Sequence, residues 1–181
     1  GFALERGNTA APYPVLDGAA ATATRARADS LIARHGIATA GAGEIAAWQA
    51  EAGRTTYLFD LRAPEEIAAD PAPAFLPALS GQLVQATDQW VGVRLARLVL
   101  LDDLGLRAAI AAFWLRQLGY EVAVARLDDA LRRLPAPAAA PTLPAVDEVA
   151  AGVALLAVRD GVAHFVDVRG SHAYRAGHVA G

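Results

Sequence analysis

Short apolar runs alternate with longer segments of helical composition along the middle of the chain. The runs at 56–62, 97–101 and 120–125 are apolar and end near charged residues or glycine, which predicts buried strands. The segments predicted to be helical are 20–35, 43–52, a short helix opening at Pro64, 82–93, 107–118 and 128–134. Strands that alternate with helices predict a three-layer α/β fold, with a central parallel sheet flanked by helices.

Segments rich in proline and glycine divide the chain. Residues 1–19 predict an extended linker, and the three prolines within 70–81 exclude a regular element there. Residues 135–144 form a semi-rigid Pro/Ala linker, which marks a domain boundary. Beyond this linker, the sequence predicts a helix over 146–152 and a strand over 164–169.

The residue types that are missing narrow the possible chemistry. The chain has no Cys, which excludes a disulfide, a thiolate nucleophile and a Cys-ligated metal site. All 16 basic residues are Arg, so Schiff-base catalysis by Lys and a phosphate-binding Gly-Lys-Thr loop are excluded too. The chain also lacks Met, and we therefore expect it to be a fragment of a longer protein.

Charge and hydropathy argue against two classes of partner. The formal net charge is -3 and there is no basic run, which argues against a nucleic acid. No apolar stretch reaches the roughly 18 residues of a membrane-spanning helix, and the N-terminus lacks a signal-peptide pattern. We therefore predict a cytoplasmic protein with no membrane partner.

The chain contains an internal repeat. Asp60 and Arg62 end the first predicted strand, and Asp167 and Arg169 end the strand predicted after the Pro/Ala linker. Each pair follows a predicted helix. A repeat of this kind implies two copies of one structural unit, of which the second is cut off soon after it starts.

The second copy carries a specific family signature. Its sequence VDVRGSHAYRAGHVAG resembles the opening signature of rhodanese (sulfurtransferase) domains, an Asp-x-Arg strand followed by Gly-His-Ile/Val-x-Gly. The matching residues are Asp167, Arg169, Gly177, His178, Val179 and Gly181. The segment from about residue 40 to 134 resembles a whole domain of this family, and the resemblance implies the rhodanese-like fold for it.

The loop after the strand at 97–101 is where the central segment departs from the family pattern. In the family, this strand is followed by a Cys-x-x-Gly-x-Arg loop and then a helix. The corresponding residues here are Asp102, Asp103, Leu104, Gly105, Leu106 and Arg107. The glycine and the arginine match, whereas Asp102 stands at the cysteine position. The Gly-His-x-x-Gly signature is also replaced, by the Pro-rich segment 71–77.

This departure decides what the resemblance implies for function. Enzymes of the family carry a sulfane sulfur as a cysteine persulfide, in a cradle of backbone N–H groups at a helix N-terminus that stabilises anions. A carboxylate at Asp102 has no sulfur to carry. The resemblance therefore implies a catalytically silent domain without a cofactor. It also implies a parent protein that transfers sulfane sulfur from thiosulfate or a similar donor.

The resemblance also predicts how the chain is organised. Residues 1–37 are expected to be a linker and the tail of a preceding rhodanese unit, because the segment 1–7 is similar to such a tail. Residues 38–134 would be a degenerate rhodanese-like domain, 135–144 the linker, and 145–181 the truncated start of a further domain. The expected partners are neighbouring rhodanese domains of the same parent, with a homo-oligomer as a further candidate.

The remodelled loop leaves alternatives open. Asp102 and Asp103 are candidates for holding a cation or a positively charged partner, or for an acid–base pair in a hydrolase. The structural alternative is that Asp102 caps the following helix and Asp103 faces solvent. Arg107 is a candidate for binding an anion or for pairing with these carboxylates.

The signature residues have structural interpretations as well. For Asp60 and Arg62 we expect a salt bridge at the end of their strand rather than a part in orienting the loop. The resemblance implies that His178 mainly hydrogen-bonds the sheet, and no metal site is predicted. Because a parallel strand is buried on both faces, the strand at 164–168 is expected to pair with something other than a complete domain of its own.

Overall fold

The computed structural model describes residues 16–137 and 145–179. The chain divides into two compact units, residues 1–138 and residues 139–181. The first, the central unit, holds the sheet. The second, the C-terminal unit, contains two helices. The expected tail of a preceding unit, at residues 1–7, lies outside the described residues.

A five-stranded, wholly parallel sheet forms the middle of the central unit, in the order β1-β5-β4-β2-β3. The strands are β1 (Ala38–Thr39), β2 (Thr56–Asp60), β3 (Leu76–Pro77), β4 (Arg97–Asp102) and β5 (Glu121–Arg126). All six residues of β4 are buried, as expected for a central strand with helices on both faces. The ends of β2, β4 and β5 meet at one edge, because Asp60 pairs with Leu101 and Asp102 with Arg126.

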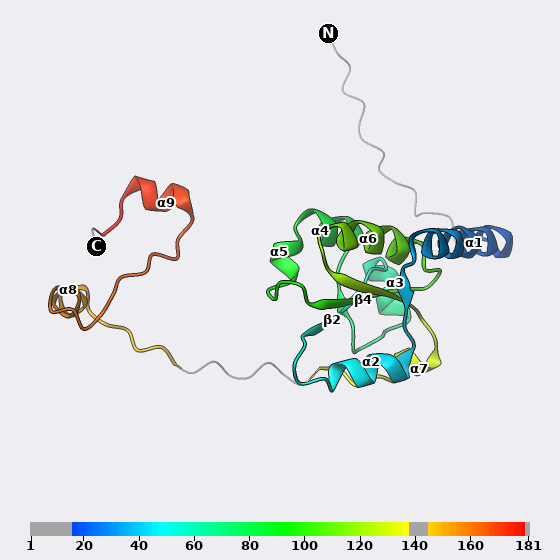
Figure 1. The fold of residues 1–181 in the computed structure, drawn as a ribbon, viewed down its shortest axis with the longest axis horizontal. Helices are drawn as coiled ribbons and strands as arrows, with labels where there is room; N and C mark the ends of the chain where they lie inside the picture. The colour runs from blue at the N-terminus through cyan, green and yellow to red at the C-terminus, as the bar shows by residue number, and fades with distance from the viewer. Residues whose placement is uncertain (1–15, 138–144, 180–181) are drawn as a thin grey trace, which may run out of the picture. The chain divides into compact units, whose positions relative to one another are not determined.

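Helices cover both faces of this sheet, with α1, α4 and α6 on one face and α2 and α7 on the other (Figure 1). Their bounds are α1 (Gly18–His35), α2 (Ala42–Gln49), α3 (Pro64–Ala69), α4 (Ser80–Gln85), α5 (Thr87–Trp90), α6 (Leu106–Gln117) and α7 (Asp129–Arg132). A hydrophobic core lies on each face of the sheet, and alternate residues of β4 contribute to each. Leu98 and Leu100 pack in the core on the α6 side, and Val99 and Leu101 in the core on the α2 side. The predicted three-layer α/β architecture is confirmed.

Two local predictions in this unit are wrong. The segment 70–81 was expected to hold no regular element, yet β3 forms within it and pairs with β2. Pro77 is tolerated because β3 is an edge strand, where the missing N–H costs no ladder hydrogen bond. The helix expected over 82–93 is instead two short helices, α4 and α5, interrupted at Ala86, whose backbone leaves the helical region (φ -131, ψ 49).

Helix α1 belongs to the same compact unit as the sheet. It begins at Asp17, whose side chain accepts the N–H of Ala20, and ends at Gly36, which adopts a left-handed conformation (φ 55). Ala28 is fully buried, and Ile32 packs against the core on the α6 side. The central unit therefore includes residues before 38, the residue at which the domain predicted from the sequence begins. An Ala-rich helix shows little hydrophobic contrast between its two faces, which hides its buried side from sequence patterns.

The C-terminal unit contains α8 (Ala151–Arg159) and α9 (Ser171–Ala176), and none of its described residues is buried. The prediction of a helix over 146–152 is wrong for its first part, since α8 begins only at Ala151. The strand predicted over 164–169 is absent: these residues form no strand and pair with none of the described chain. A parallel strand needs neighbouring strands, and the described residues of this unit offer none.

Candidate functional site

The loop between β4 and α6 is held in a conformation that requires glycine. Gly105 lies just before α6 with φ +84, a left-handed conformation. A Cβ atom at this position would lie 2.6 Å from Nε of Arg126, the last residue of β5. The backbone angle disfavours a side chain at Gly105, and an added Cβ atom would also have to displace the guanidinium of Arg126.

Asp102 lies at the centre of the loop and is almost fully buried, with 1% of its surface exposed. Its Oδ2 accepts the backbone N–H of Arg107, in the first turn of α6, at 2.9 Å. Its Oδ1 accepts the backbone N–H of Asp103 at 3.0 Å and Nε of Arg107 at 2.8 Å. The carboxylate thus binds one N–H group in the first turn of α6, that of Arg107, and one in the loop before it, that of Asp103.

Arg107 joins three carboxylates. Besides Asp102, its guanidinium contacts Oδ1 of Asp103 through Nη2 at 2.8 Å and Oε2 of Glu66 through Nη1 at 2.6 Å. The same Glu66 oxygen accepts the N–H of Ala63 at 2.6 Å, which fixes the start of α3. With each side of its guanidinium bonded to carboxylate oxygens, Arg107 is engaged within the protein and is not open to an external anion.

Glu66 and Arg126 are site residues that sequence reasoning missed. Glu66 lies in the first turn of α3, which directly follows β2, the strand beside β4. Arg126 lies opposite Asp102 in the register of β5 and β4, and its Nη2 donates to Asp29 of α1. The order of the strands could have identified them, because Glu66 closely follows β2 and Arg126 ends β5, and both strands lie beside β4.

Burial dominates the electrostatics of the loop. It raises the pKa of Asp102 to about 6, helped by the neighbouring Asp103 and opposed by Arg107. Burial acts to raise the pKa of Asp103 as well, but its interactions with Asp102, the N–H of Leu104 and Arg107 outweigh burial and lower it. Asp102 is therefore the carboxylate in this cluster whose charge depends on mildly acidic pH.

Asp60 and Arg62 form a separate, internal ion pair at the end of β2. Nη2 of Arg62 lies 2.6 Å from Oδ2 of Asp60, and its Nε lies 2.9 Å from Oδ1. The two side chains are 1% and 2% exposed. The hydrogen bonds of this pair stay within the pair and do not reach the loop, which agrees with the structural salt bridge expected from the sequence.

The C-terminal unit repeats this pair without its surroundings. Arg169 contacts Asp167 with Nη2 to Oδ2 at 2.6 Å, and Nη2 also donates to the carbonyl of Gly177 at 2.8 Å. His178, expected to hydrogen-bond a sheet, instead lies with Nδ1 3.0 Å from the carbonyl of Tyr174 and stacks on its ring. The reason is that no strand is present in the described part of this unit. Gly181 lies outside the described residues.

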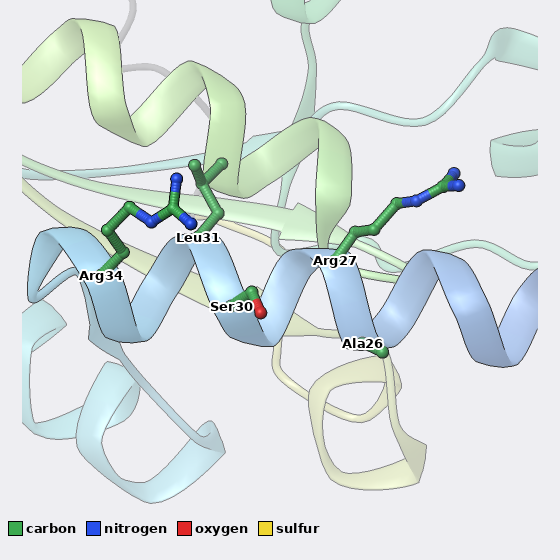
Figure 2. Close-up of a pocket in the computed structure, with 5 residues that line it drawn as sticks. All are labelled: Ala26, Arg27, Ser30, Leu31 and Arg34. Carbon is green, nitrogen blue, oxygen red and sulfur yellow. The ribbon is translucent and has the colours of Figure 1, made fainter.

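Other features of the described chain do not assemble into a reactive centre. A solvent-open hollow of about 330 Å³ lies on one face of α1, between Arg27 and Arg34 (Figure 2), and none of its lining residues belongs to the loop. Within residues 16–137 and 145–179, no group of three or more His, Asp or Glu side chains is placed to hold a metal ion. No helix of the same residues is both long and apolar enough to cross a membrane.

Comparison with known proteins places this geometry in context. The chain is similar to a crystal structure of thiosulfate sulfurtransferase from Pseudomonas aeruginosa, with a TM-score of 0.63 and 38% sequence identity. The match covers 81% of this chain and 28% of that chain. No protein-family model and no curated protein matches the chain. The structural similarity, together with the five-stranded parallel sheet, supports a rhodanese-like domain.

Proposed function

We propose that the central unit is a catalytically silent rhodanese-like domain. One observation carries this proposal: the carboxylate of Asp102 occupies the N–H cradle at the start of α6, at the position where the family pattern has cysteine. A carboxylate gains the electrostatic stabilisation that such a cradle gives to anions, but it has no sulfur that could receive and pass on a sulfane sulfur.

The surroundings of Asp102 support the same conclusion. The chain has no Cys that could act in place of the missing thiol. Arg107, the cation of the loop, is already neutralised by Asp102, Asp103 and Glu66, so no free positive charge remains in the described loop to bind thiosulfate.

The alternative of a cation-binding loop finds less support in the geometry. Asp102 is buried and accepts three hydrogen bonds, so its oxygens do not face solvent. The oxygens of Asp103 and Glu66 nearest the loop already bind Arg107. A cation would therefore compete with this guanidinium for both carboxylates.

We further propose that the chain is part of a larger sulfurtransferase with tandem rhodanese domains. It spans 28% of the thiosulfate sulfurtransferase that it resembles, and the Asp-x-Arg pair occurs twice in it, with the same local geometry. In such a protein, the central unit would serve as a spacer or regulatory module, with the neighbouring rhodanese domains as its partners. A cytoplasmic location remains a prediction from the sequence.

The proposal is tested by a sulfurtransferase assay on the purified chain. We expect no thiocyanate from thiosulfate and cyanide above a blank without protein, because the reaction requires a thiolate. An active rhodanese assayed in parallel shows that the conditions permit turnover. Thiocyanate production that rises with the concentration of the chain would contradict the assignment.

A further inference from the structure

Arg126 joins the loop between β4 and α6 to a helix that is distant in sequence. It is the last residue of β5 and pairs with Asp102 in the register of the sheet. Its Nη2 donates a hydrogen bond to Oδ1 of Asp29 in α1. The same guanidinium also faces Gly105, where an added Cβ atom would lie 2.6 Å from Nε and 3.3 Å from Nη2. The guanidinium therefore lies between α1 and the glycine that precedes α6.

Asp29 is the residue that holds this guanidinium in place. The Nε atom of Arg126 is buried, yet it has no hydrogen-bond partner among the described residues. In the same part of the chain, the contact with Asp29 is the one hydrogen bond or ion pair that the Arg126 side chain makes. A buried donor without a partner is unfavourable, so Nε gains nothing from its present position. If Asp29 moves away, no polar contact in the described chain retains Arg126 beside Gly105.

The ion pair between Asp29 and Arg126 is open to water. The two side chains are 62% and 36% exposed. Ion pairs at such positions contribute little to stability, and release of the guanidinium would let water reach Nε. The paired and the released arrangements of Arg126 are therefore close in free energy. A small displacement of α1 is then enough to change the balance between them.

The loop responds to the position of Arg126 because Gly105 lies directly against it. Gly105, with φ +84, turns the chain from the loop into α6. The guanidinium packs on this turn and limits its movement. Two residues later, Arg107 makes the ion pairs with Asp102 and Glu66. A change at Gly105 therefore reaches the residues that hold the carboxylate of Asp102.

We propose that Asp29 and Arg126 couple the position of α1 to the conformation of the loop Asp102–Arg107. While the pair is formed, Arg126 packs on Gly105 and holds the loop in its present conformation. When α1 moves, Arg126 is released and the loop gains freedom. The coupling does not depend on the proposed function, but its use rests on it: among tandem rhodanese domains, α1 would relay a movement to the silent loop.

Urea unfolding of the full chain, followed by Trp fluorescence, tests this coupling. Gly105→Ala requires the guanidinium to give way, which is easier once Asp29→Ala has removed its partner. We expect the factor by which Gly105→Ala raises the unfolding constant to be at least threefold smaller in the Asp29→Ala background than in the parent chain. Equal factors in the two backgrounds would overturn the proposal.

Two further backgrounds show whether the effect passes through Arg126. In the Arg126→Ala background the guanidinium is gone, so Asp29→Ala should no longer change the factor for Gly105→Ala. In the Asp88→Ala background, the same change at an exposed position of α5, the factor should equal that of the parent chain. An equal effect of Asp29→Ala with and without Arg126 would refute coupling through the guanidinium.

Nuclear magnetic resonance separates coupling from simple stabilisation. Removal of a pair that only stabilises the fold would leave the amide signals of the loop in place. We expect Asp29→Ala and Arg126→Ala to shift the amide signal of Gly105 in the same direction, and Asp88→Ala to leave it unchanged. An unchanged Gly105 signal in the folded Asp29→Ala variant would disprove the proposal. None of these measurements involves sulfur transfer, so a failed coupling is distinguishable from a failed assignment of the silent domain.

Discussion

The same Asp-x-Arg pair occurs in two different environments in this chain. In the central unit, Asp60 and Arg62 end a strand and are 1% and 2% exposed, whereas Asp167 and Arg169 lie in a segment without regular structure, 22% and 51% exposed. The Nη2–Oδ2 distance is nevertheless 2.6 Å in both pairs, and the N–H of each arginine donates to the aspartate two residues earlier. The bridge is therefore encoded by local sequence, while the strand and its burial depend on distant partners.

This difference predicts unequal energetic roles for the two arginines. Arg62→Ala leaves the carboxylate of Asp60 buried and unpaired, and we expect a loss of about 3–5 kcal/mol in the unfolding free energy of the central unit. Asp167, the partner of Arg169, is already partly exposed to water, so we expect Arg169→Ala to cause no measurable change in unfolding free energy. All three Trp residues lie in the central unit, so their fluorescence during urea unfolding measures Arg62→Ala. For Arg169→Ala, in the C-terminal unit, the urea transition is followed through the backbone amide NMR signals of α8 and α9. Similar losses for the two variants would show that burial does not distinguish the pairs.

Burial also predicts a difference in pH dependence between Asp102 and Asp167. The pKa of Asp102 is raised to about 6, above its unfolded value of about 3.9, so the folded central unit binds this proton more tightly than the unfolded chain does. The stability contributed by protonated Asp102 is present below about pH 4 and is lost as the pH rises to about 6. Exposed Asp167, with its pKa lowered to about 2 by Arg169, contributes nothing in this range.

The variant Asp102→Asn should remove this dependence, and Asp167→Asn should retain it. We expect the difference in unfolding free energy between the parent chain and Asp102→Asn to change by on the order of 2 kcal/mol between pH 4 and pH 6. Urea unfolding, followed by Trp fluorescence at a series of pH values, measures this difference. A constant difference across the range would mean that Asp102 carries the same charge throughout.

The fold was predictable from the sequence where the signal was local or strongly apolar. The runs that became β2, β4 and β5 are continuous and apolar, and the Asp102–Arg107 loop followed from its place after β4. By contrast, β3 consists of two residues in a Pro-rich segment and exists because it pairs with β2. The strand predicted over 164–169 failed for the reverse reason, since its sequence favours a strand but the described residues supply no neighbour.

The candidate site was predictable only in part. Asp102, Gly105 and Arg107 were identified through the resemblance of the loop to the Cys-x-x-Gly-x-Arg pattern, and the hydrogen bond of Asp102 to the start of α6 was expected from its position before a helix. Glu66 and Arg126 were not identified, because they reach the loop from α3 and β5. Sequence separation hides such contacts until the strand order is known.

Two glycines with left-handed backbones allow the effect of space to be separated from that of conformation. Gly105 (φ +84) faces Arg126, whereas a Cβ atom at Gly36 (φ +55), at the end of α1 in the same unit, would meet nothing within 4 Å. Gly105→Ala should therefore destabilise the central unit by about 1–3 kcal/mol, through backbone strain and displacement of Arg126. Gly36→Ala carries the strain alone and should cost about 1 kcal/mol in the same Trp-monitored urea transition. A loss from Gly105→Ala below about 0.5 kcal/mol would show that the loop relaxes freely.

A cysteine placed in the loop tests whether the anion cradle survives without Asp102. In Asp102→Cys, the N–H groups of Asp103 and Arg107 and the guanidinium of Arg107 would face the sulfur. Burial and Asp103 outweigh these groups at Asp102, and we therefore expect a thiol pKa above the free value of about 8.5. Val166→Cys, in the C-terminal unit, 80% exposed and outside any helix, is the control, expected near the free value. The rate of alkylation by iodoacetamide as a function of pH gives both values. A pKa for Asp102→Cys at least one unit below that of the control would mean that the N–H cradle and Arg107 outweigh burial and the carboxylates of Asp103 and Glu66. Only weak persulfide formation is expected even with a lowered pKa, because Asp103 adds negative charge beside the sulfur.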